Sequence, residues 1–226
     1  GYKFDHRILF AADYGVPQMR RRLVVLGSRE GPPPVHPEPT HCAQEPAPLF
    51  TAGLPGYVTC GEALGDLPLI EQGQTTELYE GEPSGSYQVA MRVGATSQLF
   101  NHQAGKHREH VQQYLALIPP GGTCLDIPES VRRGKQGIQR WPLDGLARTI
   151  TTEPTDFVHP TLHRIPTVRE EARIQSFPDR YEFKGQRTTG NQMRRLGYCS
   201  QTQQVGNAVP PLLAKAVGQS IIRSLT

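Results

Sequence analysis

The sequence predicts a mixed α/β fold, and three observations support this prediction. Apolar residues on both sides of a polar turn, Ile8-Leu9-Phe10 and Leu23-Val24-Val25-Leu26, are typical of two strands joined by a loop. Near the C-terminus, apolar and small residues recur at helical spacing over 213–221. Between these ends, many of the 23 glycines and 21 prolines interrupt regular structure, so loops are expected to take a large share of the chain.

The N-terminal loop carries a distinctive run, Gly15-Val16-Pro17-Gln18-Met19-Arg20-Arg21-Arg22. Alternate side chains of an extended segment face the same way, so Arg20 and Arg22 would point together. Guanidinium is a rigid fork of donors, and such a pair can clamp a phosphate and reach an acceptor oxygen on a base. The alternative is a solvated edge strand protected by its charges.

The next segment, 31–56, holds eight prolines and predicts an extended connector that crosses a surface. Thr59-Cys60-Gly61-Glu62 is a capping box that predicts a short helix ending near Gly65 and Pro68. We expect 71–88 to be an exposed, mobile acidic loop and 92–100 to be a strand.

Three histidines lie close together at His102, His107 and His110, but they do not predict a metal site. No cysteine is near, only Glu109 could complete a tetrahedral set, and Lys106 would repel a cation. The apolar spacing after His107 predicts a helix over roughly 107–118.

The segment 121–148 is rich in glycine and basic residues, which suits a loop that fits into a groove. Its long polar side chains can donate to base edges or phosphates, and we predict DNA contacts by Arg132, Arg133, Lys135, Gln136, Gln139 and Arg140. A flexible surface loop without such contacts is the alternative.

Charge is segregated along the chain although the net charge is only +3. Residues 30–90 contain nine acidic and no Lys or Arg residues, whereas 183–226 contain six Lys or Arg and no acidic residues. This pattern suits a chain with one face toward a polyanion. Four unpatterned cysteines and no long apolar run predict an intracellular protein, cytoplasmic if bacterial.

Three stretches together resemble the C-terminal half of a DNA (cytosine-5)-methyltransferase. Gln18-Met19-Arg20-Arg21-Arg22 resembles the Gln-x-Arg-x-Arg motif of that family, and Gly206-Asn207-Ala208-Val209-Pro210-Pro211 resembles its last motif. Between them, 164–179 resembles the penultimate motif and includes a second capping box, Thr167-Val168-Arg169-Glu170, which predicts a helix to about Ser176.

The resemblance implies part of an S-adenosylmethionine-dependent, Rossmann-like sheet together with a smaller, loop-rich target-recognition domain. We expect 1–29 to be the last strands of the catalytic domain, 30–185 the recognition domain with its connecting segments, and 186–226 the segment and helix that return to the catalytic domain. The family's Pro-Cys nucleophile, cofactor-binding glycine turn and Glu-Asn-Val carboxylate are absent, and no cysteine of this chain follows a proline. Either a part of a longer enzyme or one subunit of a split enzyme would have this sequence, and it is expected to be inactive alone.

The resemblance also implies roles for individual residues. Arg22 would contact cytosine O2, Arg20 the phosphate of the flipped nucleotide or the catalytic loop, and Gln18 would brace the turn. Thr149 would contact the DNA backbone, and Asn207, Ala208 and Val209 would meet S-adenosylmethionine. In the complete enzyme a thiolate adds to C6 of the flipped base before C5 takes the methyl group.

The implied partners are double-stranded DNA and the N-terminal half of the enzyme, in the setting of restriction-modification. Two alternatives remain: a non-catalytic DNA-binding or regulatory subunit, and a fragment of a tRNA cytosine-5 methyltransferase. The long segment 30–145 favours DNA, because the tRNA branch of the family has a compact recognition region.

Overall fold

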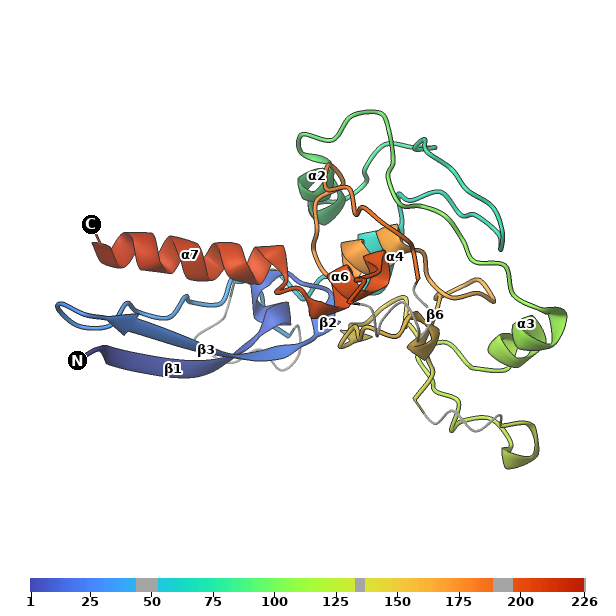
Figure 1. The fold of residues 1–226 in the computed structure, drawn as a ribbon, viewed down its shortest axis with the longest axis horizontal. Coiled ribbons are helices and arrows are strands. Elements are labelled where there is room, and N and C mark those ends of the chain that lie inside the picture. Colours follow the sequence, from blue (N-terminus) through green and yellow to red (C-terminus); the bar gives the residue numbers. More distant parts are fainter. Residues whose placement is uncertain (44–52, 133–136, 189–196, 226) are drawn as a thin grey trace.

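The chain forms an arm and a body, which follow one another along the long axis of the molecule (Figure 1). The structure is a computed structural model that describes residues 1–43, 53–132, 137–188 and 197–225. The arm consists of the strands β1 (Lys3–Phe10) and β3 (Arg21–Ser28) and the helix α7 (Pro211–Leu225). The body holds the remaining helices, and both chain ends lie at the tip of the arm (Figure 1).

The two strands of the arm form an antiparallel ribbon, as predicted for residues 1–29. Lys3 pairs with Ser28 and Phe10 pairs with Arg21. A 3-10 helix, η1 (Ala11–Tyr14), follows β1 and ends at Gly15, whose φ of 80° is favourable only for glycine. The turn therefore depends on glycine at this position.

One face of the ribbon packs against α7. Leu9 and Val24 lie on this face and form an apolar cluster with Leu213 and Val217, the latter two from the predicted stripe of α7. Leu213 is almost fully buried, which shows that the helical spacing in the sequence identifies the packing face correctly.

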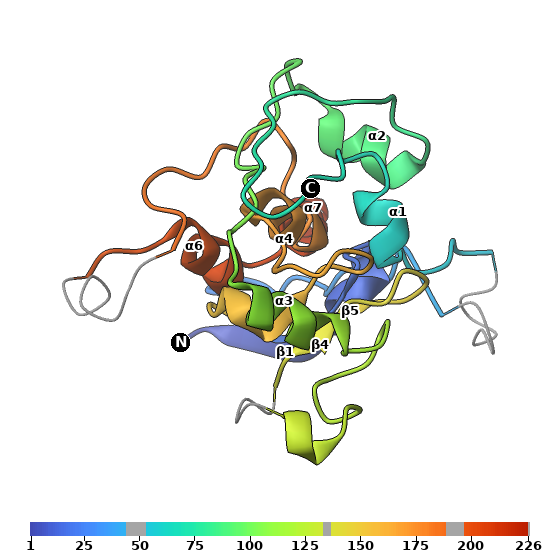
Figure 2. The ribbon, with the colours of Figure 1, turned by 90° about the vertical axis from the view of Figure 1, so that its right-hand side faces the viewer.

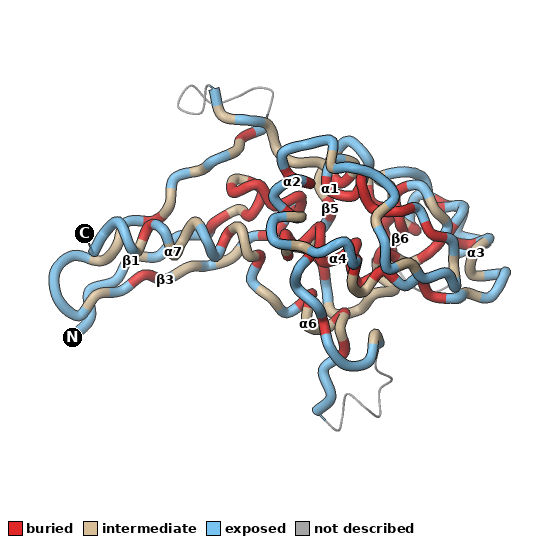
Figure 3. Tube along the Cα trace, turned by 90° about the horizontal axis from the view of Figure 1, so that it is seen from above, coloured by how far each residue is buried: buried red, intermediate tan, exposed pale blue. Residues whose placement is uncertain are grey.

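The opposite face of the ribbon is apolar and uncovered in this chain. Phe4 and Ile8 are each 67% exposed, and Leu23 and Val25, which belong to the same face by register, are 62% and 56% exposed. The arm accordingly contains long exposed stretches, whereas buried segments gather in the body (Figure 3). Four large apolar side chains on one face are typical of a surface that another protein segment covers.

Four short helices surround the main core of the body: α1 (Cys60–Leu64), α2 (Ser86–Arg92), α4 (Val168–Ile174) and α6 (Gln201–Asn207). Trp141 is fully buried among their apolar side chains. The predicted capping boxes are confirmed, because Thr59 caps α1 and Thr167 caps α4. Ser200 forms a third capping box at α6, which the sequence analysis did not identify.

Two parallel pairs of two-residue strands connect the segments. β2 (Gln18–Met19) pairs with β5 (Ala147–Arg148), and β4 (Gln139–Arg140) pairs with β6 (Phe157–Val158). The helix α3 (Glu109–Ala116) packs with these segments through a smaller cluster that includes Ile118 and Val158 and lies at the end of the body away from the arm (Figures 1 and 2). Two further 3-10 helices lie in the connecting loops: η3 (Glu129–Val131) between α3 and β4, and η4 (Pro154–Asp156) between β5 and β6.

Two expectations for the middle of the chain are wrong. The segment 92–100 is not a strand. Its first residue, Arg92, ends α2, and its pairing with another segment is a single antiparallel bridge between Gln98 and Leu78. The end of the expected mobile loop 71–88 is also helical. Tyr87 and Met91 bury their side chains in the main core, and this packing stabilises a short helix whose flanking glycines suggested a loop.

Buried charges join α4 to its surroundings. Arg173 binds Asp66 and Asp179, with the shortest contacts at 2.7 and 2.6 Å. Arg164 makes a two-pronged contact with Glu170 at 2.8 and 2.7 Å. Burial alone would raise the pKa of Glu170, but the hydrogen bonds from Arg164 and the charges of His159 and Arg164 lower it to about 2.

Candidate functional site

Arg20 lies at the point where the arginine turn meets two distant segments of the chain. Its side chain is only 2% exposed. One terminal nitrogen donates to the carbonyl of Ile150 at 3.0 Å, and the other donates to the carbonyls of Gly206 and Ala208, both at 3.0 Å. A single guanidinium thus holds the segment after Thr149 against the segment around Asn207.

Gln18 and Gln175 complete this arrangement. Gln18 is fully buried; its amide nitrogen donates to Gln175 Oε1 at 2.6 Å, and its oxygen accepts from the backbone N–H of Ile150 at 2.9 Å. The amide nitrogen of Gln175 donates to the carbonyls of Val205 and Ala208, both at 3.0 Å. We call the side chains of Gln18, Arg20 and Gln175 the junction.

Backbone carbonyl groups stabilise the positive charge of Arg20. Burial, and then the nearby charge of Arg22, lower the pKa of Arg20 to about 10, so the side chain stays protonated at neutral pH. Both terminal nitrogens of Arg20 already donate to carbonyls of the chain, and a contact of Arg20 with a phosphate or with the catalytic loop stays a prediction. Gln18 braces the turn against α4 and Ile150 rather than within the loop itself.

Arg22 lies two residues after Arg20 and has a different environment. It is partly exposed, and its guanidinium donates to the carbonyl of Arg21 at 2.7 Å. Arg20 lies between β2 and β3 and Arg22 is the second residue of β3, and the charge of Arg22 contributes to lowering the pKa of Arg20. Arg22 is therefore the arginine of this pair that can still reach a ligand.

Thr149 borders an open cavity of about 370 Å³ beside the junction. Its hydroxyl donates to the carbonyl of Met19 at 2.8 Å. Met19 and Arg148 also line the cavity, and their backbones are directly paired in the β2–β5 ladder. Sequence reasoning missed Met19 and Arg148 as site residues, although each adjoins a residue that it did identify.

Asn207 is the last residue of α6, and α7 begins four residues later at Pro211. Asn207 and Val209 are exposed, whereas the Ala208 carbonyl between them is fixed by the junction. Two exposed side chains on either side of a fixed backbone can form one wall of a cofactor site. At Gly206, a Cβ atom would come within 2.2 Å of the Thr151 carbonyl, so only glycine allows this close approach.

Two of the six residues predicted to contact DNA in 121–148 are buried. Arg140 is buried and donates to four carbonyls, those of Leu115, Ile118, His159 and Leu162, at 2.6–2.9 Å. Gln139 is also buried, and its amide donates to Gly121 at 3.3 Å. These two side chains pin α3 and its loop instead of facing a groove.

Arg132 is exposed but folds back onto the carbonyls of its own loop, at Leu125 and Ile127. The other three predicted contacts, Arg133, Lys135 and Gln136, lie outside the described residues. DNA contacts by these four residues remain a prediction.

The cysteines do not offer a nucleophile near the junction. None of the four forms a disulfide, and Cys42, Cys60 and Cys124 are buried. Burial raises the pKa of Cys60 to about 12, which keeps it a thiol at neutral pH. Within the described ranges, no cluster of three His, Cys, Asp or Glu residues could hold a metal ion, and no helix could span a membrane.

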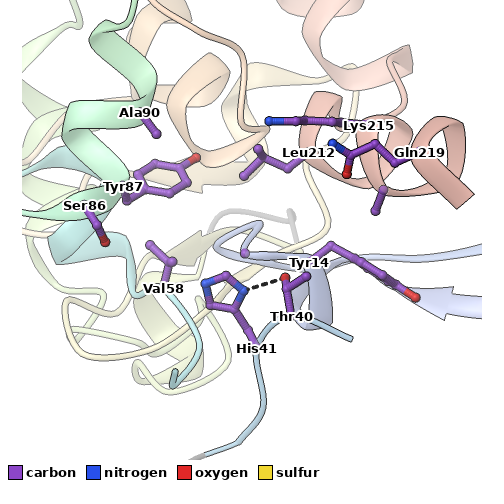
Figure 4. Close-up of a pocket in the computed structure, with 12 residues that line it drawn as sticks. Tyr14, Thr40, His41, Val58, Ser86, Tyr87, Ala90, Leu212, Lys215 and Gln219 are labelled. Atoms are coloured by element: carbon purple, nitrogen blue, oxygen red, sulfur yellow. Dashed lines mark hydrogen bonds between the residues drawn. The ribbon is translucent and has the colours of Figure 1, made fainter. Parts of the chain in front are cut away.

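A second cavity, of about 290 Å³, lies between the arm and the body (Figure 4). Its lining comes from five separate segments and includes Tyr14, His41, Tyr87 and Lys215. The hydroxyls of Tyr14 and Tyr87 donate to the carbonyls of Pro37 and Arg173, so both hydroxyl groups already have hydrogen-bond partners within the chain. The cavity contains none of the site residues predicted from the sequence.

Comparison with known proteins shows which protein family this chain matches. The profile described as C-5 cytosine-specific DNA methylase matches residues 1–223. The chain is 35% identical over 237 residues to the type II methyltransferase M.DdeI of Desulfomicrobium norvegicum, covering 98% of this chain and 54% of that protein. It is 31% identical over 229 residues to M1.HphI of Haemophilus parahaemolyticus, covering 100% of this chain and 50% of that protein. The chain thus spans about half the length of these relatives.

A solved structure supports the fold. A putative DNA modification methyltransferase encoded within an E. coli prophage superposes with a TM-score of 0.68 at 20% identity, over 99% of this chain and 61% of that one. At this identity the likeness concerns the fold alone. The predicted mixed α/β class is confirmed as a fold similar to that methyltransferase.

Proposed function

Because this chain belongs to the C-5 cytosine-specific DNA methylase family, whose members use S-adenosylmethionine, we propose that it is the C-terminal part of a DNA (cytosine-5)-methyltransferase. The observation that carries the proposal is the junction. Arg20 and Gln18 join the arginine turn, the segment around Thr149 and the segment around Asn207, which are far apart in the sequence. Gln175, which belongs to 164–179, accepts from Gln18 and donates to the carbonyls of Val205 and Ala208, so the three stretches that carry the resemblance also meet here.

Each part of this place has a proposed task. Arg22, partly exposed and charged, holds an acceptor oxygen of the flipped cytosine, and the cavity beside Thr149 receives the adjacent DNA backbone. Asn207 and Val209 bind one side of S-adenosylmethionine, which supplies the methyl group when bound. The catalytic thiolate comes from outside this chain, since none of its four cysteines follows a proline and three of them are buried.

The partner is the remainder of the same enzyme. The uncovered face of the ribbon presents Phe4, Ile8, Leu23 and Val25, and the chain covers only about half of its relatives. Burying large apolar side chains of this size contributes about 1.5–3 kcal/mol each, so this face supplies a substantial driving force for assembly. We propose that the N-terminal half packs here and extends the two-stranded ribbon into a sheet.

The test is reconstitution with a complementary N-terminal half from a related methyltransferase. Transfer of a labelled methyl group to duplex DNA of mixed sequence is measured with both parts, with each part alone, and with tRNA in place of DNA. We expect transfer to DNA only when both parts are present. Methylation by this chain alone, or of tRNA in preference to DNA, would contradict the proposal.

Two arginine variants make the test specific. Arg22→Ala removes a donor proposed to act on the reacting base, and loss of such a donor lowers turnover roughly 100-fold or more. Arg21→Ala is the matched control, because Arg21 lies over the ring of Phe10 at 4.5 Å and has no proposed role in the site. Equal effects of the two substitutions would remove the basis for the role of Arg22.

A further inference from the structure

We propose that Gln175 and Ser176 form a clamp that positions the segment 205–212 and so sets the affinity for S-adenosylmethionine. This inference rests on the proposed function, because Asn207 and Val209 lie within that segment. Gln175 and Ser176 are positioning residues: they act through the backbone of the segment and have no proposed contact with the cofactor.

The clamp holds the segment on both sides of the exposed residues. Gln175 donates to the carbonyls of Val205 and Ala208, both at 3.0 Å. The hydroxyl of Ser176 accepts from the backbone N–H of Leu212, in the first turn of α7, at 3.2 Å. Two adjacent residues thus fix the end of α6, the connection that follows and the start of α7.

The clamp itself is held rigidly. Gln175 and Ser176 are buried, and Gln175 Oε1 accepts from Gln18 Nε2 at 2.6 Å. Ser176 has a φ of 64°, which is unusual for a residue other than glycine. Such a conformation persists only where the surroundings fix it and is often found at functional sites. Here it turns the serine hydroxyl toward the start of α7 while the preceding glutamine reaches the end of α6.

The clamp also gives a reason for a polar pair in the core. A core position next to Phe177 could be filled by an apolar residue, but Gln175 donates to the Ala208 carbonyl just after α6 and gives the Val205 carbonyl a second donor besides the Ala208 N–H. The backbone of 205–208 is therefore fixed before a ligand binds. A site that is already ordered loses less entropy on binding, which increases affinity.

The experiment measures binding of S-adenosylmethionine to the reconstituted enzyme by equilibrium dialysis, without DNA. Gln175→Met keeps the length of the side chain but removes the amide that donates to Val205 and Ala208 and accepts from Gln18. We expect the Kd to rise roughly tenfold, because the segment 205–208 loses two hydrogen bonds that fix it. At saturating cofactor, kcat should stay within a few fold of the wild type, because the reacting groups are unchanged. Amide hydrogen exchange of 206–212 should accelerate in the same variant.

Two further variants separate positioning from stability. Gln88→Met is the matched control: Gln88 is also buried, donates to the Glu62 carbonyl at 2.8 Å and accepts from Ser84 N–H, but it lies on α2. It should lower the melting temperature without changing the Kd. Ser176→Gly removes the hydroxyl and also relieves the positive φ, so it should fold even if Gln175→Met does not, and still weaken cofactor binding.

The outcomes are distinguishable. If Gln175→Met and Ser176→Gly bind cofactor as tightly as the wild type, the clamp is structural only and the inference is wrong, whereas the proposed function stands. If Gln88→Met raises the Kd as much as Gln175→Met, general destabilisation explains the effect and the inference is again wrong. If the wild-type reconstituted enzyme binds no S-adenosylmethionine, the proposed function fails and the inference fails with it.

Discussion

Replacing Arg20 by lysine tests whether the junction stabilises the protein or binds a ligand. Lysine keeps the positive charge but presents a single nitrogen, which cannot reach the carbonyls of Ile150, Gly206 and Ala208 together. A hydrogen bond from a charged group contributes about 1.5–3 kcal/mol, and a buried carbonyl left without a donor adds a further cost. With one of three contacts kept, we expect a loss of about 3–5 kcal/mol, a large part of the about 5–15 kcal/mol that stabilises a typical domain.

The assay is urea unfolding of the reconstituted enzyme, with Arg22→Lys as the matched control two positions along the strand. Arg22 is partly exposed and donates to one carbonyl, so its replacement should cost less than about 1 kcal/mol. If Arg20 were instead a phosphate ligand, Arg20→Lys would leave the midpoint unchanged and weaken DNA binding. An unfolding midpoint for Arg20→Lys equal to that of Arg22→Lys would therefore refute the structural role.

Three further predictions concern the body. Asp66→Asn should destabilise the protein by about 3–5 kcal/mol, measured by urea unfolding, because it leaves the charge of the buried Arg173 only partly compensated. Gly206→Ala should abolish cofactor binding or folding, detected by equilibrium dialysis and circular dichroism, because the added Cβ would overlap the Thr151 carbonyl at 2.2 Å. The melting temperature should fall as the pH decreases from about 6.5 to about 4. The reason is that burial and, less strongly, the charges of Arg164 and Arg140 lower the pKa of His159 to about 4, although the negative charge of Glu170 opposes this shift. The unfolded chain then binds a proton that the folded chain does not. His159→Asn, whose Oδ1 can replace Nδ1 as the acceptor of the Leu162 N–H, should flatten the curve. An unchanged pH dependence in this variant would assign the effect to other groups.

Local signals in the sequence were sufficient for the elements whose ends are set by neighbouring residues. Thr59 and Thr167 cap their helices, as the Glu three positions later predicts, and the spacing of Leu213 and Val217 identifies the buried face of α7. Ser200 carries the same type of signal, with Gln203 in place of glutamate, and could have been identified in the same way.

The sequence did not predict features that depend on distant backbone atoms. Arg140 lies in a basic, glycine-rich segment and so was expected at the surface, yet it is buried because carbonyls from two other parts of the chain surround it. Arg20 is a similar case: its partners are 130 to 188 residues away along the chain. No local pattern distinguishes an arginine that binds carbonyls from one that binds phosphate, since both need the same donors.

The junction also predicts how unequally the chain tolerates change during evolution. Its three donors are side chains, but the atoms that they hold at positions 150, 206 and 208 belong to the main chain. A mutation at position 150 or 208 leaves the held oxygen in place, so natural variation there is compatible with an intact enzyme. A mutation at position 18, 20 or 175 removes a donor, and lineages that keep the enzyme are expected to retain those three residues more strictly than the residues they hold.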